Sequence, residues 1–306
     1  MKIDYTGWRP TQQKVHDLLG AAMTVTEQYA AMGYQITLRQ LYYQLVSSRV
    51  IRNHQNDYQR LSKTVRLGKE GGFIDWDHLI DRSRSLLKHP QWDSARDLLE
   101  QAALGFRVDR WLGQDRYVEL WCEKDALASV LEPMTEAQHI AFMSQKGYSS
   151  STALYEGANR FRRAYQKGQI PTVIYLGDHD PSGLQMTFDI ENRLEMLSGG
   201  DIDLEVVRLA LNHDQIEDYQ LLPNPVKLKD PRAGDYVDIY GHECWELDAL
   251  PPEVLAGMIQ TAVSTFRDPD IYAEQLAYEQ EQIQLLVSYA TKLSNPDDNS
   301  WPLWRD

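Results

Sequence analysis

The sequence predicts an α/β protein in which a mostly helical N-terminal domain, residues 1–112, precedes a domain with a parallel four-stranded sheet, residues 113–306. Three observations lead to this prediction: apolar residues at helical spacing in the first 70 positions, apolar runs alternating with helical patterns after residue 117, and a change in charge between the two parts. The chain has 306 residues, of which 42% are hydrophobic and 25% charged. These values are typical of one large or two modest globular domains.

The N-terminal part carries three amphipathic patterns. Residues 11–32 and 55–68 repeat apolar side chains at helical spacing, and residues 38–50 form a shorter helix between them. The segment 73–76 (Phe-Ile-Asp-Trp) is predicted to be a short strand. Three short helices with a small β element are typical of a winged-helix module, a DNA-binding variant of the helix-turn-helix.

In the second part of the chain, apolar runs typical of buried strands alternate with apolar residues at helical spacing. The predicted strands are residues 117–122, 139–143, 172–176 and 205–210. The predicted helices between them lie near residues 125–132, 151–167 and 182–197. Strands that alternate with helices predict a parallel sheet with right-handed crossovers. Two further helices, 251–266 and 270–292, are expected to close the fold.

The charge of the chain is unevenly divided. Residues 1–110 hold 16 basic and 12 acidic residues, a net charge of +4, whereas the remainder holds 15 and 33, a net charge of −18. A basic module joined to an acidic one favours a protein that handles DNA, although an ordinary solvated helix surface is the alternative. The candidate DNA contacts are Arg49, Arg52, Arg60, Lys63, Arg66 and Lys146.

Three carboxylates follow two of the predicted strands. Glu123 comes directly after the run 117–122, and Asp178 and Asp180 follow the run 172–176. Ligands of open α/β sheets gather at the carboxyl ends of strands. The two aspartates are two positions apart, so in an extended segment they share one side and His179 takes the other. Hard oxygen ligands of this kind suit Mg²⁺ and phosphate chemistry.

A simpler role is open to one of these carboxylates. Asp180-Pro181-Ser182-Gly183 is typical of a helix N-cap followed by proline at the first helical position. Capping accounts for Asp180 alone, and it explains neither the pair of aspartates nor Glu123. The metal interpretation is therefore preferred for the group.

Several segments resemble a known family. Glu123-Lys124-Asp125-Ala126, Lys146-Gly147-Tyr148-Ser149 and the segment 178–183 resemble the Toprim domain of the topoisomerase VI A subunit and of its relative, the meiotic double-strand-break transesterase. The resemblance spans about residues 35–265 and implies that Mg²⁺ is bound by Glu123, Asp178 and Asp180. His179 departs from the pattern, because relatives often carry glycine or alanine there. The segment 245–250 is also similar, and its acids either serve a second metal or support the first.

The same family places a catalytic tyrosine on a winged-helix domain. Leu38-Arg39-Gln40-Leu41-Tyr42-Tyr43 is similar to that segment, which implies that Tyr43 is the nucleophile. Arg39 lies four residues before Tyr43 on the same helix face, where it would hold the scissile phosphate or stabilise developing charge. Tyr42 and Tyr43 are about 100° apart, so one of them should pack inward. The alternative is that both tyrosines belong to the core and Arg39 is a surface charge.

The resemblance implies Mg²⁺-dependent double-strand cleavage of DNA, as in the A subunit of a type IIB topoisomerase. In a homodimer, Tyr43 of one subunit would attack a phosphate bound at the Toprim metal of the other and form a 5′-phosphotyrosyl link. A second interpretation is a hydrolytic Toprim nuclease of a plasmid- or phage-defence system, in which water attacks. A third is a non-enzymatic DNA-binding subunit. The chain has no Gly-x-x-x-x-Gly-Lys-Ser/Thr loop, so any ATPase would be a separate B-type or condensin-like partner.

The hydropathy of the chain and its cysteines indicate where in the cell the protein is expected. No apolar stretch reaches the length of a membrane span, and the first residues lack the apolar core of a signal peptide. The two cysteines, Cys122 and Cys244, have neither metal-ligand nor disulfide-framework spacing. The expectation is a cytoplasmic, nucleoid-associated protein without a membrane partner.

Overall fold

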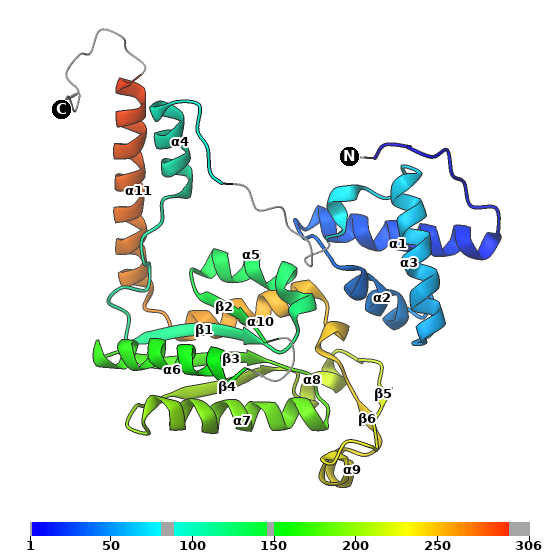
Figure 1. The fold of residues 1–306 in the computed structure, drawn as a ribbon. Coiled ribbons are helices and arrows are strands. Elements are labelled where there is room, and N and C mark those ends of the chain that lie inside the picture. Colours follow the sequence, from blue (N-terminus) through cyan, green and yellow to red (C-terminus); the bar gives the residue numbers. More distant parts are fainter. Residues whose placement is uncertain (1, 81–88, 146–149, 294–306) are drawn as a thin grey trace. The chain divides into compact units, whose positions relative to one another are not determined.

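The computed structural model describes residues 2–80, 89–145 and 150–293. The chain forms two compact units, one built from residues 1–83 and 116–266 and the other from residues 84–115 and 267–306. The first unit contains the N-terminal helices and the sheet together (Figure 1). The division into residues 1–112 and 113–306 that the sequence suggests stays a prediction.

The three N-terminal helices form where the apolar spacing predicts them. They are α1 (Gln13–Ala31), α2 (Leu38–Ser47) and α3 (Gln55–Glu70). A capping box starts α2: the Thr37 hydroxyl accepts from the backbone N–H of Gln40 at 3.2 Å, and the Gln40 side chain accepts from the N–H of Thr37 at 2.8 Å. This cap sets where α2 begins and thus which residues share its faces.

The predicted strand at residues 73–76 is wrong. Trp76–His78 form a 3₁₀ helix, η1, and the Asp75 side chain accepts from the backbone N–H of Asp77 at 3.1 Å. Aspartate competes for backbone groups in this way, which favours a turn over a ladder. Among the described residues, pairing near this turn is limited to isolated bridges such as Ile36–Leu79. The winged-helix arrangement is therefore not confirmed.

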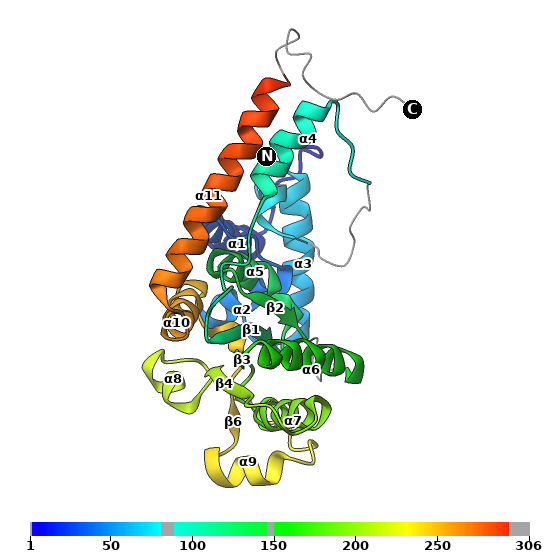
Figure 2. The ribbon, with the colours of Figure 1, turned by 90° about the vertical axis from the view of Figure 1, so that its left-hand side faces the viewer.

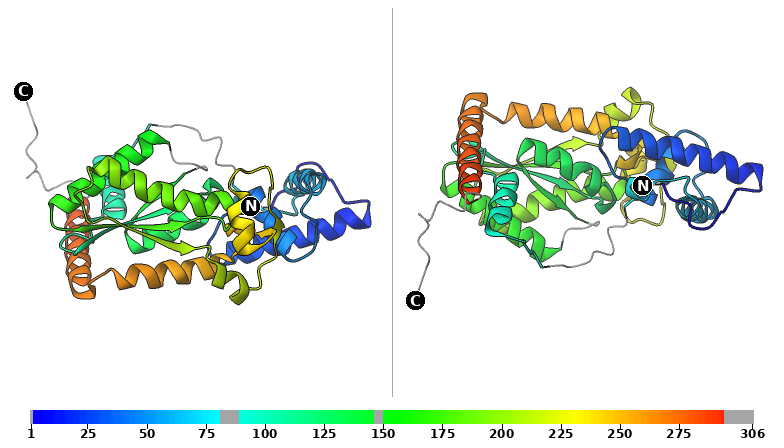
Figure 3. Two further views of the ribbon diagram at one scale, coloured as in Figure 1. Left: turned by 90° about the horizontal axis from the view of Figure 1, so that it is seen from below. Right: turned by 90° about the horizontal axis from the view of Figure 1, so that it is seen from above.

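The predicted parallel sheet is confirmed. It contains β1 (Arg116–Cys122), β2 (Ala141–Ser144), β3 (Ile170–Leu176) and β4 (Glu205–Ala210), all parallel and in the order β2-β1-β3-β4. One face packs against α6 (Ser151–Gln166) and α7 (Pro181–Ser198), with α10 (Pro252–Thr265) on the other side (Figures 2 and 3). The helix α5 (Ala128–Gln138) packs with α10 and follows a short 3₁₀ helix, η2 (Asp125–Leu127).

The core on the α6–α7 side follows strand alternation. Trp121, Val173 and Tyr175 point to one face and pack with Phe161 of α6 and Leu194 of α7, all fully buried. Alternate positions of a strand face opposite sides of a sheet, which explains why every second residue enters this cluster. Buried apolar area of this kind is the main stabilising contribution to such a sheet.

A second, small pairing region lies beyond β4. Here the elements are short: α8 (His213–Asp218), β5 (Asn224–Pro225), α9 (Ala233–Tyr240), β6 (Glu243–Cys244) and η3 (Leu247–Ala249). His179, just after β3, exchanges two backbone hydrogen bonds with Trp245, at 2.9 and 3.0 Å. This bridge attaches the segment before η3 to the carboxyl edge of the sheet.

The second unit is a helix pair. The helices α4 (Ala95–Gly105) and α11 (Pro269–Lys292) lie side by side (Figures 1 and 2). Buried Glu279 of α11 accepts from the guanidinium of Arg110 at 2.5 and 3.1 Å and from the backbone N–H of Val108 at 3.0 Å. None of the described helices is both long and apolar enough to cross a membrane.

Candidate functional site

The register of β1 and β3 brings Glu123 and Asp178 together. Cys122 pairs with Leu176, so the residues that follow both strands emerge at the same edge of the sheet. Oε2 of Glu123 accepts a hydrogen bond from the backbone N–H of Asp178 at 3.0 Å. A Cβ added at Gly177 or Gly183 would lie 3.1 or 3.2 Å from this oxygen, so the two glycines make room for the carboxylate.

Asp180 caps α7, as the simpler interpretation expects. Its Oδ1 accepts from the backbone N–H of Gly183 at 2.6 Å and from the hydroxyl of Ser182 at 3.0 Å. Its charge nevertheless reaches the neighbouring carboxyl, since it contributes to a raised pKa of Glu123. The Asp180 side chain therefore both caps α7 and adds negative charge beside Glu123.

Burial and neighbouring charges raise the pKa of two of these acids. Burial, and then the charges of Asp178 and Asp180, raise the pKa of Glu123 to about 8. Burial also raises the pKa of Asp178 to about 6, against the opposing effect of Lys124. Carboxylates placed close together in a buried site cannot all ionise without a compensating cation. The group is thus short of positive charge.

Lys124 lies at the centre of a second group of acids. Its ammonium nitrogen is 3.0 Å from Oδ1 of Asp178, 2.9 Å from Oε2 of Glu246 and 3.4 Å from Oδ1 of Asp248. Burial would lower the pKa of Lys124, but the three carboxylates outweigh it and raise the pKa well above its usual value. Asp178 belongs to both groups of acids.

Asp248 is the most deeply placed of these acids. Its residue is 3% exposed, and neither carboxylate oxygen accepts a hydrogen bond of normal geometry from the residues that the structure describes. Burial raises its pKa, while Lys124 acts in the opposite direction. The ion pair with Lys124 is therefore its principal compensation.

Tyr43 of α2 reaches the same ammonium. Nζ of Lys124 lies 5.6 Å from the centre of its ring, and Nη2 of Arg39 donates to its hydroxyl at 3.3 Å. Burial, and then the charge of Glu246, raise the pKa of Tyr43 to about 12, so the phenol is protonated at neutral pH. Glu246 is ionised: burial alone would raise its pKa, but Lys124 and the hydroxyl of Tyr43 outweigh this and lower it.

Tyr42 packs inward, as the helix geometry predicts for one of the two tyrosines. It is 6% exposed, and its hydroxyl donates to Oδ1 of Asn53 at 3.1 Å. Tyr43, by contrast, is only half-buried and lines two cavities. The neighbouring tyrosines therefore differ in burial: both border the larger of these cavities, but only Tyr43 borders the second.

Open space adjoins both Tyr43 and the acids. A cavity of about 370 Å³ is lined by Arg39, Tyr43 and Tyr58, among others. A second, of about 220 Å³, is bordered by Tyr43 and Glu246, and a third, of about 120 Å³, by Glu246 and Asp180. The first and second cavities thus share Tyr43, and the second and third share Glu246.

Two cations were not predicted as part of the site. Lys124 directly follows Glu123 and lies within the segment 123–126 that carries the family resemblance, but no role was predicted for it. Arg208 lies among the apolar residues of strand β4, between Val207 and Leu209, a position in which a charge needs a partner. It donates to the backbone carbonyls of Gly177 (3.1 Å), Asp178 (2.6 Å) and Gly183 (3.1 Å), and so stabilises the turn that carries the aspartates.

His179 turns away into an aromatic cluster. Nδ1 lies 2.9 Å from the hydroxyl of Tyr236, and Trp245 and Tyr240 pack around the ring. Burial lowers the pKa of His179 to about 4, so the imidazole is neutral. It anchors the turn between the two aspartates rather than adding charge to the acids.

The candidate DNA-binding cations lie on the surface of the helical part. Arg49, Arg52, Arg60, Lys63 and Arg66 are exposed, whereas Lys146 lies outside the described residues. Arg52 and Arg60 both pair with buried Asp57, at 3.6 and 2.8 Å, and Arg66 pairs with Glu70 at 2.9 Å. Their role in DNA binding stays a prediction.

The donors fit Mg²⁺ by their chemistry. Within the described parts of the chain, no group of three or more His, Cys, Asp and Glu side chains stands ready around a metal position. Oε2 of Glu123 is engaged by the N–H of Asp178, and Oδ1 of Asp178 by the N–H of Leu247 at 2.8 Å. Carboxylate oxygens at one sheet edge, with the pKa of Glu123 and Asp178 raised by burial and by neighbouring acids, are nonetheless a donor set that suits a hard divalent ion.

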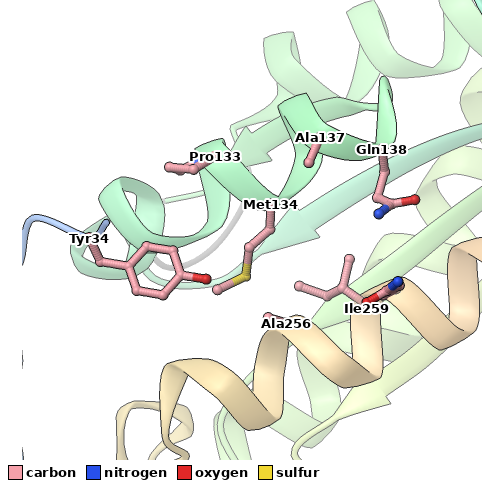
Figure 4. Close-up of a pocket in the computed structure, with 8 residues that line it drawn as sticks. Tyr34, Pro133, Met134, Ala137, Gln138, Ala256 and Ile259 are labelled. Carbon is pink, nitrogen blue, oxygen red and sulfur yellow. The ribbon is translucent and has the colours of Figure 1, made fainter. Parts of the chain in front are cut away.

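A further cavity lies away from these residues. It has a volume of about 190 Å³ and lies between α5 and α10, with Tyr34, Met134 and Ile259 on its walls (Figure 4). Its lining contains no acid or base and none of the proposed site residues. Chemistry is therefore concentrated at the sheet edge.

Comparisons with known proteins leave the family undetermined. No protein-family model matches the chain, and neither the curated proteins nor the solved structures contain a match. The relation to the topoisomerase VI A subunit accordingly remains a proposal, and the residues at the sheet edge are what supports it.

Proposed function

We propose that this chain cleaves DNA with the help of Mg²⁺ held by Glu123, Asp178 and Asp180, and that Tyr43 is the nucleophile. One observation carries the proposal. Tyr43, from α2, and Asp178, which follows β3, both contact the largely buried ammonium of Lys124. A nucleophile that lies close to carboxylates and cations is the arrangement that phosphoryl transfer requires.

The side chains around Tyr43 have the properties that its activation needs. Ionised Glu246 would take the proton of the Tyr43 hydroxyl, and Arg39, which already donates to that oxygen, would stabilise the phenolate. The phenolate oxygen would then bond to phosphorus as the bond to the 3′-oxygen of the sugar breaks, and that oxygen would take up a proton from solvent water, while Glu246 returns its proton to solvent. The product is a 5′-phosphotyrosyl link and a free 3′-hydroxyl. Bound Mg²⁺ would neutralise phosphate charge.

The contacts of Tyr43 bear on whether the tyrosine and the metal site of one reaction come from the same subunit. The resemblance implies that tyrosine and metal come from different subunits of a homodimer, whereas Tyr43 here contacts Arg39 and Lys124 of its own chain. A homodimer remains part of the proposal because a double-strand break needs two sites. Whether the reacting pair is formed within one chain is a separate question, which mixed subunits answer.

Incubation with supercoiled plasmid and Mg²⁺ tests the proposal. The expected product is nicked or linear DNA that leaves the gel well only after protease treatment, because it carries protein. Tyr43→Phe should abolish this product. Tyr42→Phe, on the adjacent position of the same helix, is the matched control and should retain it. Loss of cleavage in Glu123→Gln would support the metal site independently of the tyrosine.

Hydrolysis is the second candidate, and one observation favours it. The pKa of Tyr43 is raised to about 12, so the phenol needs more activation than a metal-bound water would. This function uses the same carboxylates and produces DNA free of protein. Cleavage that persists in Tyr43→Phe, with no protein-linked DNA, would establish it in place of the transesterase. Either function leaves ATP hydrolysis to a separate B-type or condensin-like partner.

A further inference from the structure

The acids at the sheet edge form two groups that share one member. Glu123, Asp178 and Asp180 make up the first group, which is the proposed metal site. Asp178, Glu246 and Asp248 make up the second, with the ammonium of Lys124 at 2.9 to 3.4 Å from one oxygen of each. The second group thus already surrounds a cation that belongs to the protein itself.

This second group is constructed around the lysine. Asp178 follows β3, whereas Glu246 and Asp248 lie at the start of η3, and the paired backbones of His179 and Trp245 connect these segments. Oδ1 of Asp178 also accepts from the N–H of Leu247 at 2.8 Å, which holds it in place. An ordinary ion pair needs one carboxylate per ammonium. Here three buried or half-buried carboxylates face the same one.

The formal charge of the two groups limits the number of divalent ions that they can bind. Five carboxylates (Glu123, Asp178, Asp180, Glu246 and Asp248) face three cations (Lys124, Arg39 and Arg208), which leaves a formal charge of −2 when all are ionised. One divalent ion brings this sum to zero. A second would make it positive, and it would also have to displace the ammonium from Asp178.

We propose that the Lys124 ammonium occupies the second cation position of this site, so that each chain binds one divalent ion where two-metal enzymes bind two. The proposal rests on the proposed function, since it takes the metal site of Glu123, Asp178 and Asp180 as given. In two-metal sites the ions lie about 3.5–4 Å apart and share a carboxylate. Asp178 is placed to be that shared carboxylate, with a protein ammonium on its other side.

Binding of Mn²⁺, followed by calorimetry and by electron paramagnetic resonance, tests the proposal. The wild-type chain is expected to bind one ion, which is lost in Glu123→Gln. Lys124→Met removes the charge and keeps the length of the side chain, and it should bind two ions. Adding Asp248→Asn to Lys124→Met should return the count to one. Lys124→Arg, which retains a cation, should stay at one.

The outcomes separate this proposal from the proposed function. Two ions in the wild type, or one in Lys124→Met, would overturn the role of the lysine and leave the metal site intact. No ion in the wild type would remove the metal site and both proposals with it. Because Lys124→Met leaves acids uncompensated, Glu246→Gln provides a milder test in a folded protein. It should keep one ion with affinity changed less than about tenfold, whereas loss of that ion would make Glu246 a metal ligand and overturn the proposal.

Discussion

The ammonium nitrogen of Lys124 lies 5.6 Å from the centre of the Tyr43 ring. This contact joins the helical N-terminal part to the carboxyl edge of the sheet, since Lys124 follows β1 and Tyr43 belongs to α2. The hydrogen bond from Gln44 to the carbonyl of Asp248, at 3.4 Å, connects the same two regions.

Mixed subunits should show whether the reacting groups belong to one chain. Tyr43→Phe and Glu123→Gln are each expected to be inactive in DNA cleavage. If Tyr43 acts on the metal site of its own chain, as its contacts favour, a mixture of the two variants stays inactive after subunit exchange. If it acts on the partner's site, the mixture regains nicking activity on supercoiled plasmid, because one complete site is restored. An equal mixture of wild type and Tyr43→Phe is the control for exchange.

The stability of the metal-free protein should fall as pH rises. The folded-state pKa of Glu123 is raised to about 8 and that of Asp178 to about 6, above their usual values near 4. The folded state therefore binds more protons than the unfolded state between about pH 4 and pH 8, and stability is lost across that window. Urea denaturation should show a decrease in the free energy of unfolding on the order of 5 kcal/mol between pH 5 and pH 8.

Two comparisons check the cause of this pH dependence. Glu123→Gln should flatten it, because the group with the larger shift is removed. Mg²⁺ should stabilise the protein more at pH 8 than at pH 5, because a divalent ion competes with protons for these carboxylates. An equally strong pH dependence of the free energy of unfolding in Glu123→Gln would contradict the attribution to Glu123.

Gly183→Ala adds a single methyl group, but this group should disrupt the turn that forms the metal site. The added Cβ would lie 2.3 Å from the carbonyl oxygen of Asp178 and 3.2 Å from Oε2 of Glu123. The turn must move, which we expect to cost about 1–3 kcal/mol in the free energy of unfolding and to abolish Mn²⁺ binding. The matched control is Gly257→Ala in α10, where nothing lies within 4 Å of the added Cβ. That change should stabilise the protein by roughly 0.5–1 kcal/mol.

DNA binding should depend on the exposed cations of α3. Lys63→Ala is expected to weaken binding to duplex DNA of any sequence and to reduce the salt dependence by about one counterion, as a phosphate contact predicts. Arg96→Ala, in α4 of the second unit, removes an exposed cation that pairs with Glu100 at 2.7 Å and should leave the salt dependence unchanged. Equal slopes for the wild type and Lys63→Ala, measured by fluorescence anisotropy, would exclude Lys63 from the interface.

The local spacing of apolar residues was enough to predict the main helices and strands. The apolar alternation around Trp121 and Tyr175 predicted two buried strands, and the parallel sheet follows from the helices between them. It was not enough at residues 73–76, where the capping side chain of Asp75 produces a 3₁₀ turn in place of a strand. A hydrogen bond between neighbouring residues outweighs a weak β preference when no partner strand is available.

The sequence by itself determined which carboxylates reach the sheet edge, because the residue after a strand must emerge where the strand ends. Glu123 and Asp178 are fixed in this way, and Asp180 follows from the helix cap. Only the tertiary structure decided what surrounds them. Lys124 follows β1, Arg208 lies in β4, and Glu246 and Asp248 belong to the η3 segment. Their convergence depends on strand register and on the backbone pairing of His179 with Trp245. Contacts between distant segments have no local pattern, so the cations that balance the acids became visible only in the folded chain.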